Sequence, residues 1–169
     1  SLISRVMEIF QAFPDLIFAM AIMTFMGKGV LNLFIALGLL TWVRTARMIR
    51  GSVIQLKEKE YIEASRACGA STYWIIMKGL VPNCLSTIIV LVTLGIPNAI
   101  MYEASLSFLG IGIQPPTPSW GNMISAAQTF ISFRPVYSIM PGVAIMITVI
   151  AFNIFGDGLR DALDPKLKN

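Results

Sequence analysis

The sequence predicts an all-α, polytopic integral membrane protein with four transmembrane helices in a single transmembrane domain over residues 1–169. Of its residues, 56% are hydrophobic and only 13% are charged, and the mean hydropathy is +0.74, which is far more apolar than an ordinary soluble domain. The basic residues stand beside apolar runs of helix length and form no patch on a soluble region. We therefore expect the lipid bilayer as a partner and no nucleic acid.

The first predicted span covers about residues 13–26, with Asp15 near its start, and the second covers about residues 29–48. The second has only 15 uncharged residues, or about 22 Å of helix, before Arg44. It can cross a bilayer only if Arg44 and Arg47 continue the helix and extend their guanidinium groups to the interface. A connection of only residues 27–29 predicts that the two spans are antiparallel neighbours.

The third predicted span covers about residues 83–110, begins after Pro82 and carries no charge until Glu103. The fourth covers about residues 136–155. Between them lies a predicted external loop, residues 111–135, in which Pro115 and Pro116 cannot continue a helix and Trp120 suits an interfacial anchor. Residues from Asn122 to Ser132 could form a short helix lying across the external face.

The distribution of lysine and arginine predicts the orientation. Eleven of the 13 basic residues lie in the loop between the second and third spans or near the two ends of the chain, and two lie on the opposite side, namely Lys28 and Arg134. By the positive-inside rule, the central loop and both ends of the chain face the cytoplasm. Cys68 and Cys84 are then expected as reduced thiols.

A charged stretch, residues 57–80, interrupts the apolar sequence. Its spacing predicts a short helix with Tyr61, Ala64 and Cys68 on one face. Gly69 then ends the helix, because glycine takes a left-handed C-terminal cap without steric cost, and Ser71 is a plausible N-cap for a second short helix. The stretch is a helix, a tight turn and a helix between two spans, or alternatively an amphipathic helix on the lipid surface.

The order Glu63-Ala64-Ser65, Gly69 and Pro82 resembles the EAA loop of ABC importer permeases, although a second alanine is common at Ser65. The resemblance implies that residues 57–80 form a cytoplasmic coupling loop that sits in a groove of a separate ATPase subunit. The residues that it assigns to this contact are Glu60, Tyr61, Glu63, Ala64, Ser65, Arg66, Gly69, Ala70 and Ser71.

Two further stretches, residues 103–123 and 153–166, are similar to dipeptide and oligopeptide permease subunits of the same importers. This resemblance implies the type I ABC importer permease fold in the cytoplasmic (inner) membrane of a prokaryote. It also implies a heterodimeric pore with a second permease subunit, two ABC ATPase subunits and an external substrate-binding protein. Members usually carry one or two more amino-terminal spans, so we expect those to be missing from this chain.

Glu103 is the one acid expected deep in a span, where a carboxylate is costly unless it is paired or hydrated. With Ser105 and Ser107 it is a candidate for the pathway or gate, and a structural or gating role is favoured over contact with the solute. The candidate residues of the external loop are Pro115, Pro116, Trp120 and Asn122.

No glycine-rich nucleotide-binding loop followed by a lysine is found, so we expect no enzyme activity and no bound cofactor, with ATP used by partner subunits. The absence of histidine and the two separated cysteines predict no metal site. The expected solutes are dipeptides or oligopeptides. Nickel or another small solute of the same importers, and a channel or secondary transporter without an ATPase, remain as alternatives.

Overall fold

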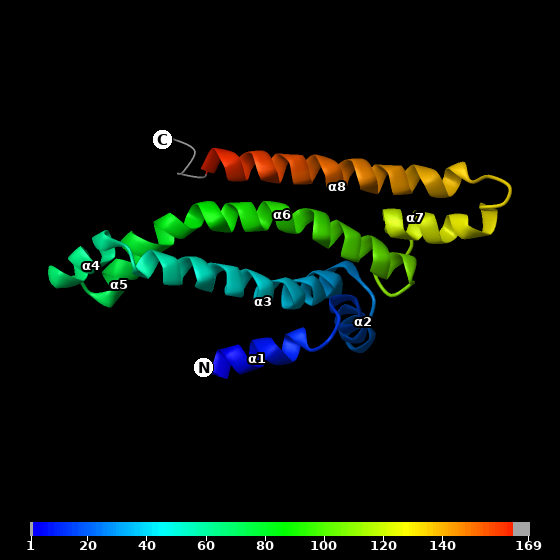
Figure 1. Cartoon of the computed structure of the whole chain (residues 1–169). Coiled ribbons are helices and arrows are strands. Elements are labelled where there is room, and N and C mark those ends of the chain that lie inside the picture. The colour runs from blue at the N-terminus through cyan, green and yellow to red at the C-terminus, as the bar shows by residue number, and fades with distance from the viewer. Residues whose placement is uncertain (1, 164–169) are drawn as a thin grey trace.

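A computed structural model describes residues 2–163, with side chains from Arg5 onward, and every regular element in this range is helical. Three helices of 28 residues lie side by side, α3 (Val30–Lys57), α6 (Val81–Phe108) and α8 (Val136–Leu163), with α6 in the middle (Figure 1). Each is long and apolar enough to cross a membrane. The predicted all-α, polytopic membrane fold is confirmed.

A sharp bend precedes most of the first predicted span, residues 13–26. The chain forms α1 (Leu2–Gln11) and α2 (Asp15–Met26), which meet at an angle of 94°. Pro14 lies between them in an extended conformation, with φ −58° and ψ 133°, and this breaks the helix. Because the 12 residues of α2 make only about 18 Å of helix, this region can cross a membrane only as a bent pair.

The core near the start of the chain joins α2 to α3 and α6. It is built from six buried residues, Ala19, Met23, Leu33, Ala36, Leu37 and Leu106. Ala19 and Ala36 are completely buried, and such small side chains allow two helix backbones to approach closely. α2 is thereby fixed against the first half of α3.

The helix that contains the third predicted span begins before Pro82. The chain is helical from Thr72 to Phe108 through α5 (Thr72–Trp74), the π-helix η1 (Ile75–Leu80) and α6. A proline inside a helix removes a hydrogen bond and crowds the carbonyl four residues earlier. The wider π-helical turn accommodates Pro82 without breaking the helix, because it shifts the hydrogen bonds by one residue.

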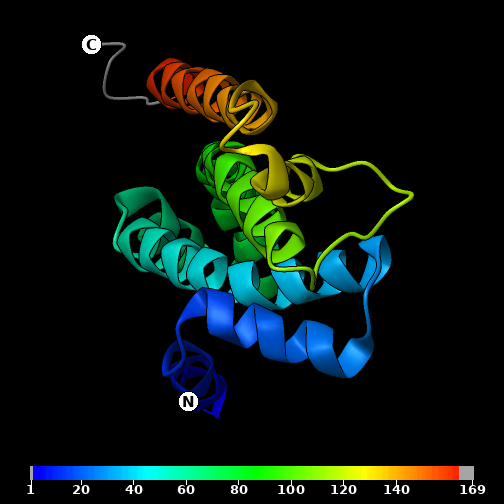
Figure 2. The same ribbon diagram turned by 90° about the vertical axis from the view of Figure 1, so that its right-hand side faces the viewer.

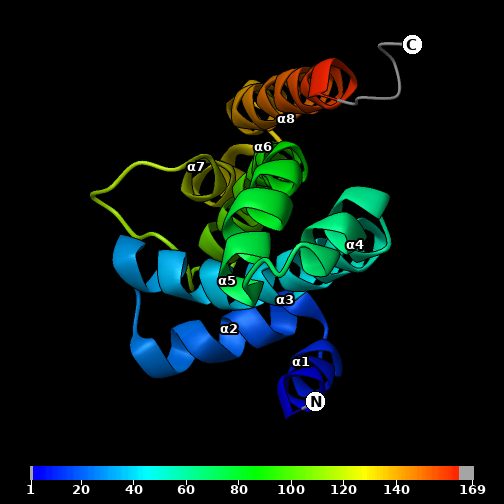
Figure 3. The ribbon, with the colours of Figure 1, turned by 90° about the vertical axis from the view of Figure 1, so that its left-hand side faces the viewer.

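The predicted external loop, residues 111–135, contains α7 (Trp120–Ala127) and a 3₁₀ turn, η2 (Gln128–Phe130). α7 does not lie across the end of the bundle as expected. It runs beside α6 and α8 and is seen nearly end-on next to them in Figures 2 and 3. The reason is Gly121, where a Cβ would lie 2.2 Å from the Ala104 carbonyl oxygen. Only glycine permits this contact between α7 and α6.

The two ends of the bundle differ. α4 (Glu60–Ala67) and α5 lie at one end, and α7 and its loops lie at the other (Figure 1). The start of α1 and the end of α8 point to the α4 end. This arrangement puts the two ends of the described chain on the same side as residues 57–80, as the predicted orientation requires, and the orientation itself stays a prediction.

Candidate functional site

The predicted helix, turn and helix are present at the α4 end of the bundle. Gly69 has φ 78°, the left-handed conformation that ends α4, and the Ala70 N–H donates to the Ser65 carbonyl oxygen at 3.0 Å. The Ser71 hydroxyl oxygen accepts from the Trp74 N–H at 3.3 Å and so caps α5. The two features expected of Gly69 and Ser71 are confirmed.

α4 is attached to the long helices through Ile62, which is completely buried. Ile62 forms a small core with Ile75 and Leu80 of η1, and Val53 and Leu56 of α3 pack against it. Since η1 continues directly into α6, α4 is packed against both α3 and the helix that leads into α6. Sequence reasoning missed Ile62, because only the motif residues on either side of it were considered.

Gly79 is the point where α4 comes closest to η1. A Cβ at this position would lie 2.8 Å from the Ile62 Cδ1 atom. The Gly79 carbonyl oxygen accepts from the Tyr61 hydroxyl at 3.3 Å and from the Asn83 side-chain amide at 2.7 Å. The available sequence signal for this contact was a glycine, Gly79, within the second helical stretch, residues 72–80.

The three residues that were predicted to share one face of α4 are exposed. Tyr61, Ala64 and Cys68 are all exposed to solvent, as are Glu60, Glu63 and Arg66. Ser65 is partly buried, and its hydroxyl donates to the Tyr61 carbonyl oxygen at 2.7 Å. We use the name outer face for five exposed residues of α4 and its C-cap, namely Glu60, Glu63, Ala64, Arg66 and Cys68.

The candidate pathway residues divide into two groups. The Ser107 hydroxyl donates to the Glu103 carboxylate at 2.7 Å and accepts from the Ile113 N–H at 3.0 Å. Ser107 is 1% exposed. Ser105 is not part of this chain of hydrogen bonds, because its hydroxyl donates to the Met101 carbonyl oxygen of its own helix. Glu103 thus fixes the turn that follows α6, which supports its structural role.

The turn after α6 depends on glycine. Gly110 has φ 75°, and a Cβ at Gly112 would lie 2.6 Å from the Ser107 hydroxyl oxygen. Trp120 and Glu103 line a shared cavity of about 390 Å³. Of the other candidates in the external loop, Pro115 and Pro116 are exposed, and Asn122 is partly buried. Within residues 5–163, the Asn122 side-chain nitrogen has no hydrogen-bond partner.

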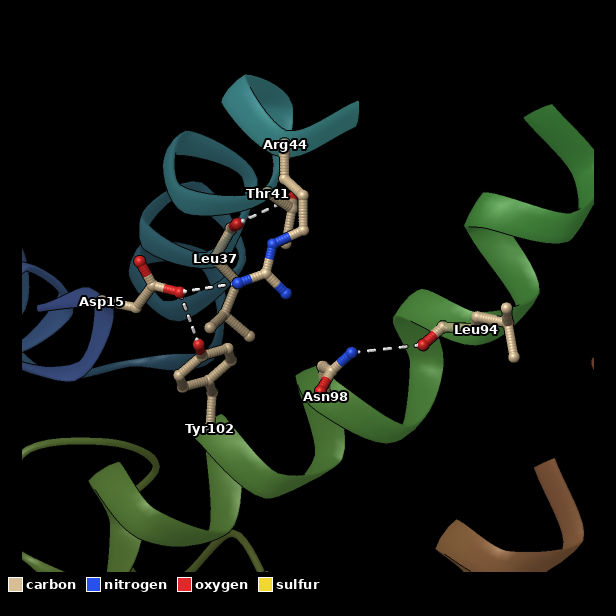
Figure 4. A network of polar contacts seen from close by, with 7 residues as sticks. All are labelled: Asp15, Leu37, Thr41, Arg44, Leu94, Asn98 and Tyr102. Atoms are coloured by element: carbon tan, nitrogen blue, oxygen red, sulfur yellow. Dashed lines mark hydrogen bonds and ion pairs between the residues drawn. The ribbon is translucent and has the colours of Figure 1, made fainter. Parts of the chain in front are cut away.

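A polar cluster that sequence reasoning missed joins α2, α3 and α6 (Figure 4). An Asp15 carboxylate oxygen accepts from the Tyr102 hydroxyl at 2.7 Å and lies 3.3 Å from an Arg44 guanidinium nitrogen. Arg47 donates to the side chain of Gln11. α3 continues through Arg44 and Arg47, as expected, and the extension of their guanidinium groups to the interface stays a prediction. The bend at Pro14 turns Asp15 toward Arg44, and the spacing of residues in the sequence does not predict this bend.

The whole chain, residues 1–169, matches the family of binding-protein-dependent transport system inner membrane components. It is 42% identical over 167 residues to the glutathione transport system permease protein of Shigella flexneri serotype 5b and to that of Escherichia coli O157:H7. Each alignment covers 99% of this chain and 55% of the relative, so the chain spans about half the length of the curated relatives it matches.

The match over every residue and the identity to these permeases agree with the helical membrane fold and with the motifs in residues 57–82 and 103–123. The chain therefore belongs to the family of inner membrane permease components of binding-protein-dependent transport systems.

Proposed function

We propose that this chain forms part of a permease subunit that imports short peptides and that receives its driving force from separate ATPase subunits through residues 57–80. The observation that carries the proposal is the attachment of α4: its outer face is exposed, and its opposite side is fixed by Ile62 to α3 and η1. A force applied to the outer face would move α3 and α6 together.

The continuous helix from Thr72 to Phe108 supports this mechanism. It begins in the turn after α4 and ends at the hydrogen bonds of Glu103 and Ser107 on the other side of the bundle. A rotation of α4 caused by ATPase closure would tilt this helix and so act on the opposite end of the permease. Rigid helices with two discrete arrangements can couple distant sites in this way.

The proposed partners are a second permease subunit, two ABC ATPase subunits and an external substrate-binding protein in the cytoplasmic membrane. The family supports this assembly, because its members are components of binding-protein-dependent systems. ATP is then hydrolysed by the ATPase subunits. The residues proposed to contact them are the outer face of α4 and the turn at Gly69.

Short peptides are the proposed solutes. The relatives at 42% identity are glutathione permeases by name, and glutathione is itself a peptide. This support concerns the transport systems to which the relatives belong. The external binding protein is expected to contribute much of the selectivity.

The replacement Gly69→Val in the full-length subunit tests the coupling. At Gly69 no atom lies within 4 Å of an added Cβ, so the variant suffers only from the left-handed backbone, about 1 kcal/mol or more for a β-branched residue. We expect ATP hydrolysis to continue while peptide import falls.

The matched control is Gly51→Val in α3, where an added Cβ also meets nothing within 4 Å and the backbone is helical. It should keep both activities, because valine has a slightly higher helix propensity than glycine. Normal import by the Gly69→Val transporter, with normal ATPase association, would show that the coupling does not pass through this turn.

A further inference from the structure

Arg44, Asp15 and Tyr102 meet although they come from three helices (Figure 4). One oxygen of Asp15 contacts both the guanidinium group and the phenol hydroxyl, so the position of Arg44 is set by α2 and α6 as well as by its own helix. Asn98 lies one helical turn from Tyr102 on the same side of α6, and it is exposed. Thr41 lies one turn from Arg44 on α3 and is also exposed.

The ion pair lies at membrane depth. Arg44 is near the middle of the 28 residues of α3, about 20 Å from each end of the helix. Because the hydrocarbon core is about 30 Å thick, Arg44 falls inside it when the core lies within the length of α3.

This ion pair cannot face lipid. The side chains of Arg44 and Asp15 are 68% and 41% exposed. Charged side chains in membrane spans face the inside of a protein or a cavity filled with water, because lipid offers no hydrogen bonds. The exposed side of Arg44, with Thr41 and Asn98 near it, is thus a polar surface that belongs inside the assembled transporter.

Arg44 keeps binding capacity for a second anion. A guanidinium group has five N–H donors in one plane, and its distance of 3.3 Å to Asp15 is longer than the 2.7–2.9 Å usual for a charge-assisted hydrogen bond. The planar fork matches a carboxylate in a two-bond geometry. Asp15 also repels an incoming carboxylate, so binding at Arg44 would be weak, as transit requires.

We propose that Arg44 lines the water-filled translocation route and binds the carboxylate of a passing peptide, with Asp15 and Tyr102 as positioning residues. This inference rests on the proposed import of peptides and assigns a solute contact to this chain. The N–H groups of Arg44 that do not contact Asp15 donate to the peptide carboxylate. Asp15 keeps the guanidinium group in place when no peptide is bound.

The test uses the full-length permease assembled with its partner subunits, after its cysteines, Cys68 and Cys84 among them, have been replaced by serine. The replacement Asn98→Cys introduces a thiol near Arg44, and Thr41→Cys provides a second reporter on α3 if the first variant fails to assemble. Two water-soluble methanethiosulfonates are the probes, one with a sulfonate group and one with a quaternary ammonium group.

We expect both probes to label the thiol. Adding Arg44→Gln should slow the sulfonate probe by roughly tenfold and should not slow the ammonium probe, since local charge concentrates ions of opposite sign. Lys28→Gln, which removes a positive charge from the connection between α2 and α3, should change neither rate. Lack of labelling by both probes at both positions, or sulfonate labelling that does not depend on Arg44, would overturn the proposal.

A dipeptide delivered by the binding protein then tests the ligand. The dipeptide should slow the labelling more than the same dipeptide with an amidated C-terminus does. Arg44→Gln should abolish this difference. Equal protection by both peptides would also overturn the proposal. If the wild-type complex imports peptides but labelling is independent of Arg44, this inference fails and the proposed function stands. If labelling depends on Arg44 but no peptide is imported, the proposed function fails instead.

Discussion

At the scale of single residues, three glycines determine how closely the elements approach. Gly79 makes room for Ile62, Gly112 for Ser107 and Gly121 for the Ala104 carbonyl oxygen. All three glycines lie in the motif stretches, residues 57–80 and 103–123, and each permits a close contact because it has no side chain. In the turn after α6, this allows Ser107 to connect Glu103 with the Ile113 N–H.

The contact at Gly121 gives the first prediction at this scale. Gly121→Ala would place a Cβ against backbone atoms that cannot rotate away, so α7 must shift from α6 at a cost of about 1–3 kcal/mol. The melting temperature of the purified full-length complex should fall. Gly142→Ala in α8 is the control, because nothing lies within 4 Å of its added Cβ. Equal melting temperatures for the two variants would mean that α7 is not packed on α6 as described.

At the scale of elements, the unit that matters is α4 with its attachment. The residues that make α4 recognisable as a motif are mostly exposed, and the residue that fixes it, Ile62, lies between them. This division suits a docking element, because the outer face can contact a partner while the buried side transmits the force.

Ile62→Ala should loosen α4 without changing its outer face. Removing a buried isoleucine costs about 2–5 kcal/mol, and here the loss falls on the contact between α4 and η1. Hydrogen exchange of the amides in α4 should become faster, and import per ATP hydrolysed should decrease. Ile54→Ala in α3 provides the control, since Ile54 is 51% exposed. Unchanged exchange in α4 would show that Ile62 does not anchor it.

At the scale of the whole molecule, composition and hydropathy were sufficient to predict the helical membrane fold, and periodicity with turn residues predicted Gly69 and Ser71 correctly. The bend at Pro14 and the passage of a helix through Pro82 were not predicted, because each depends on neighbouring elements. For the same reason, the contact of Arg44 with Asp15 and Tyr102 had no signal in the sequence: these residues are far apart in the chain and meet only after α2 has folded back.

The orientation of the whole molecule can be tested with the exposed thiol of Cys68. In cells, a membrane-impermeant thiol reagent should label Cys68 only after permeabilisation, because residues 57–80 are predicted to face the cytoplasm. In a variant without Cys68, Thr117→Cys in the exposed loop before α7 should be labelled from outside. The reverse pattern would place the outer face of α4 on the wrong side for an ATPase.

The contact between α4 and an ATPase subunit is the central claim, and site-specific photo-crosslinking measures it most directly. A photoreactive amino acid at Glu63 or Ala64, both exposed on the outer face, is compared with one at Met123, which is exposed on α7 at the opposite end. In cells that express the full-length subunit with its partners, Glu63 and Ala64 should give an adduct with an ATPase subunit, and Met123 should not. Absence of the adduct at both α4 positions, or an equal yield at Met123, would contradict the account.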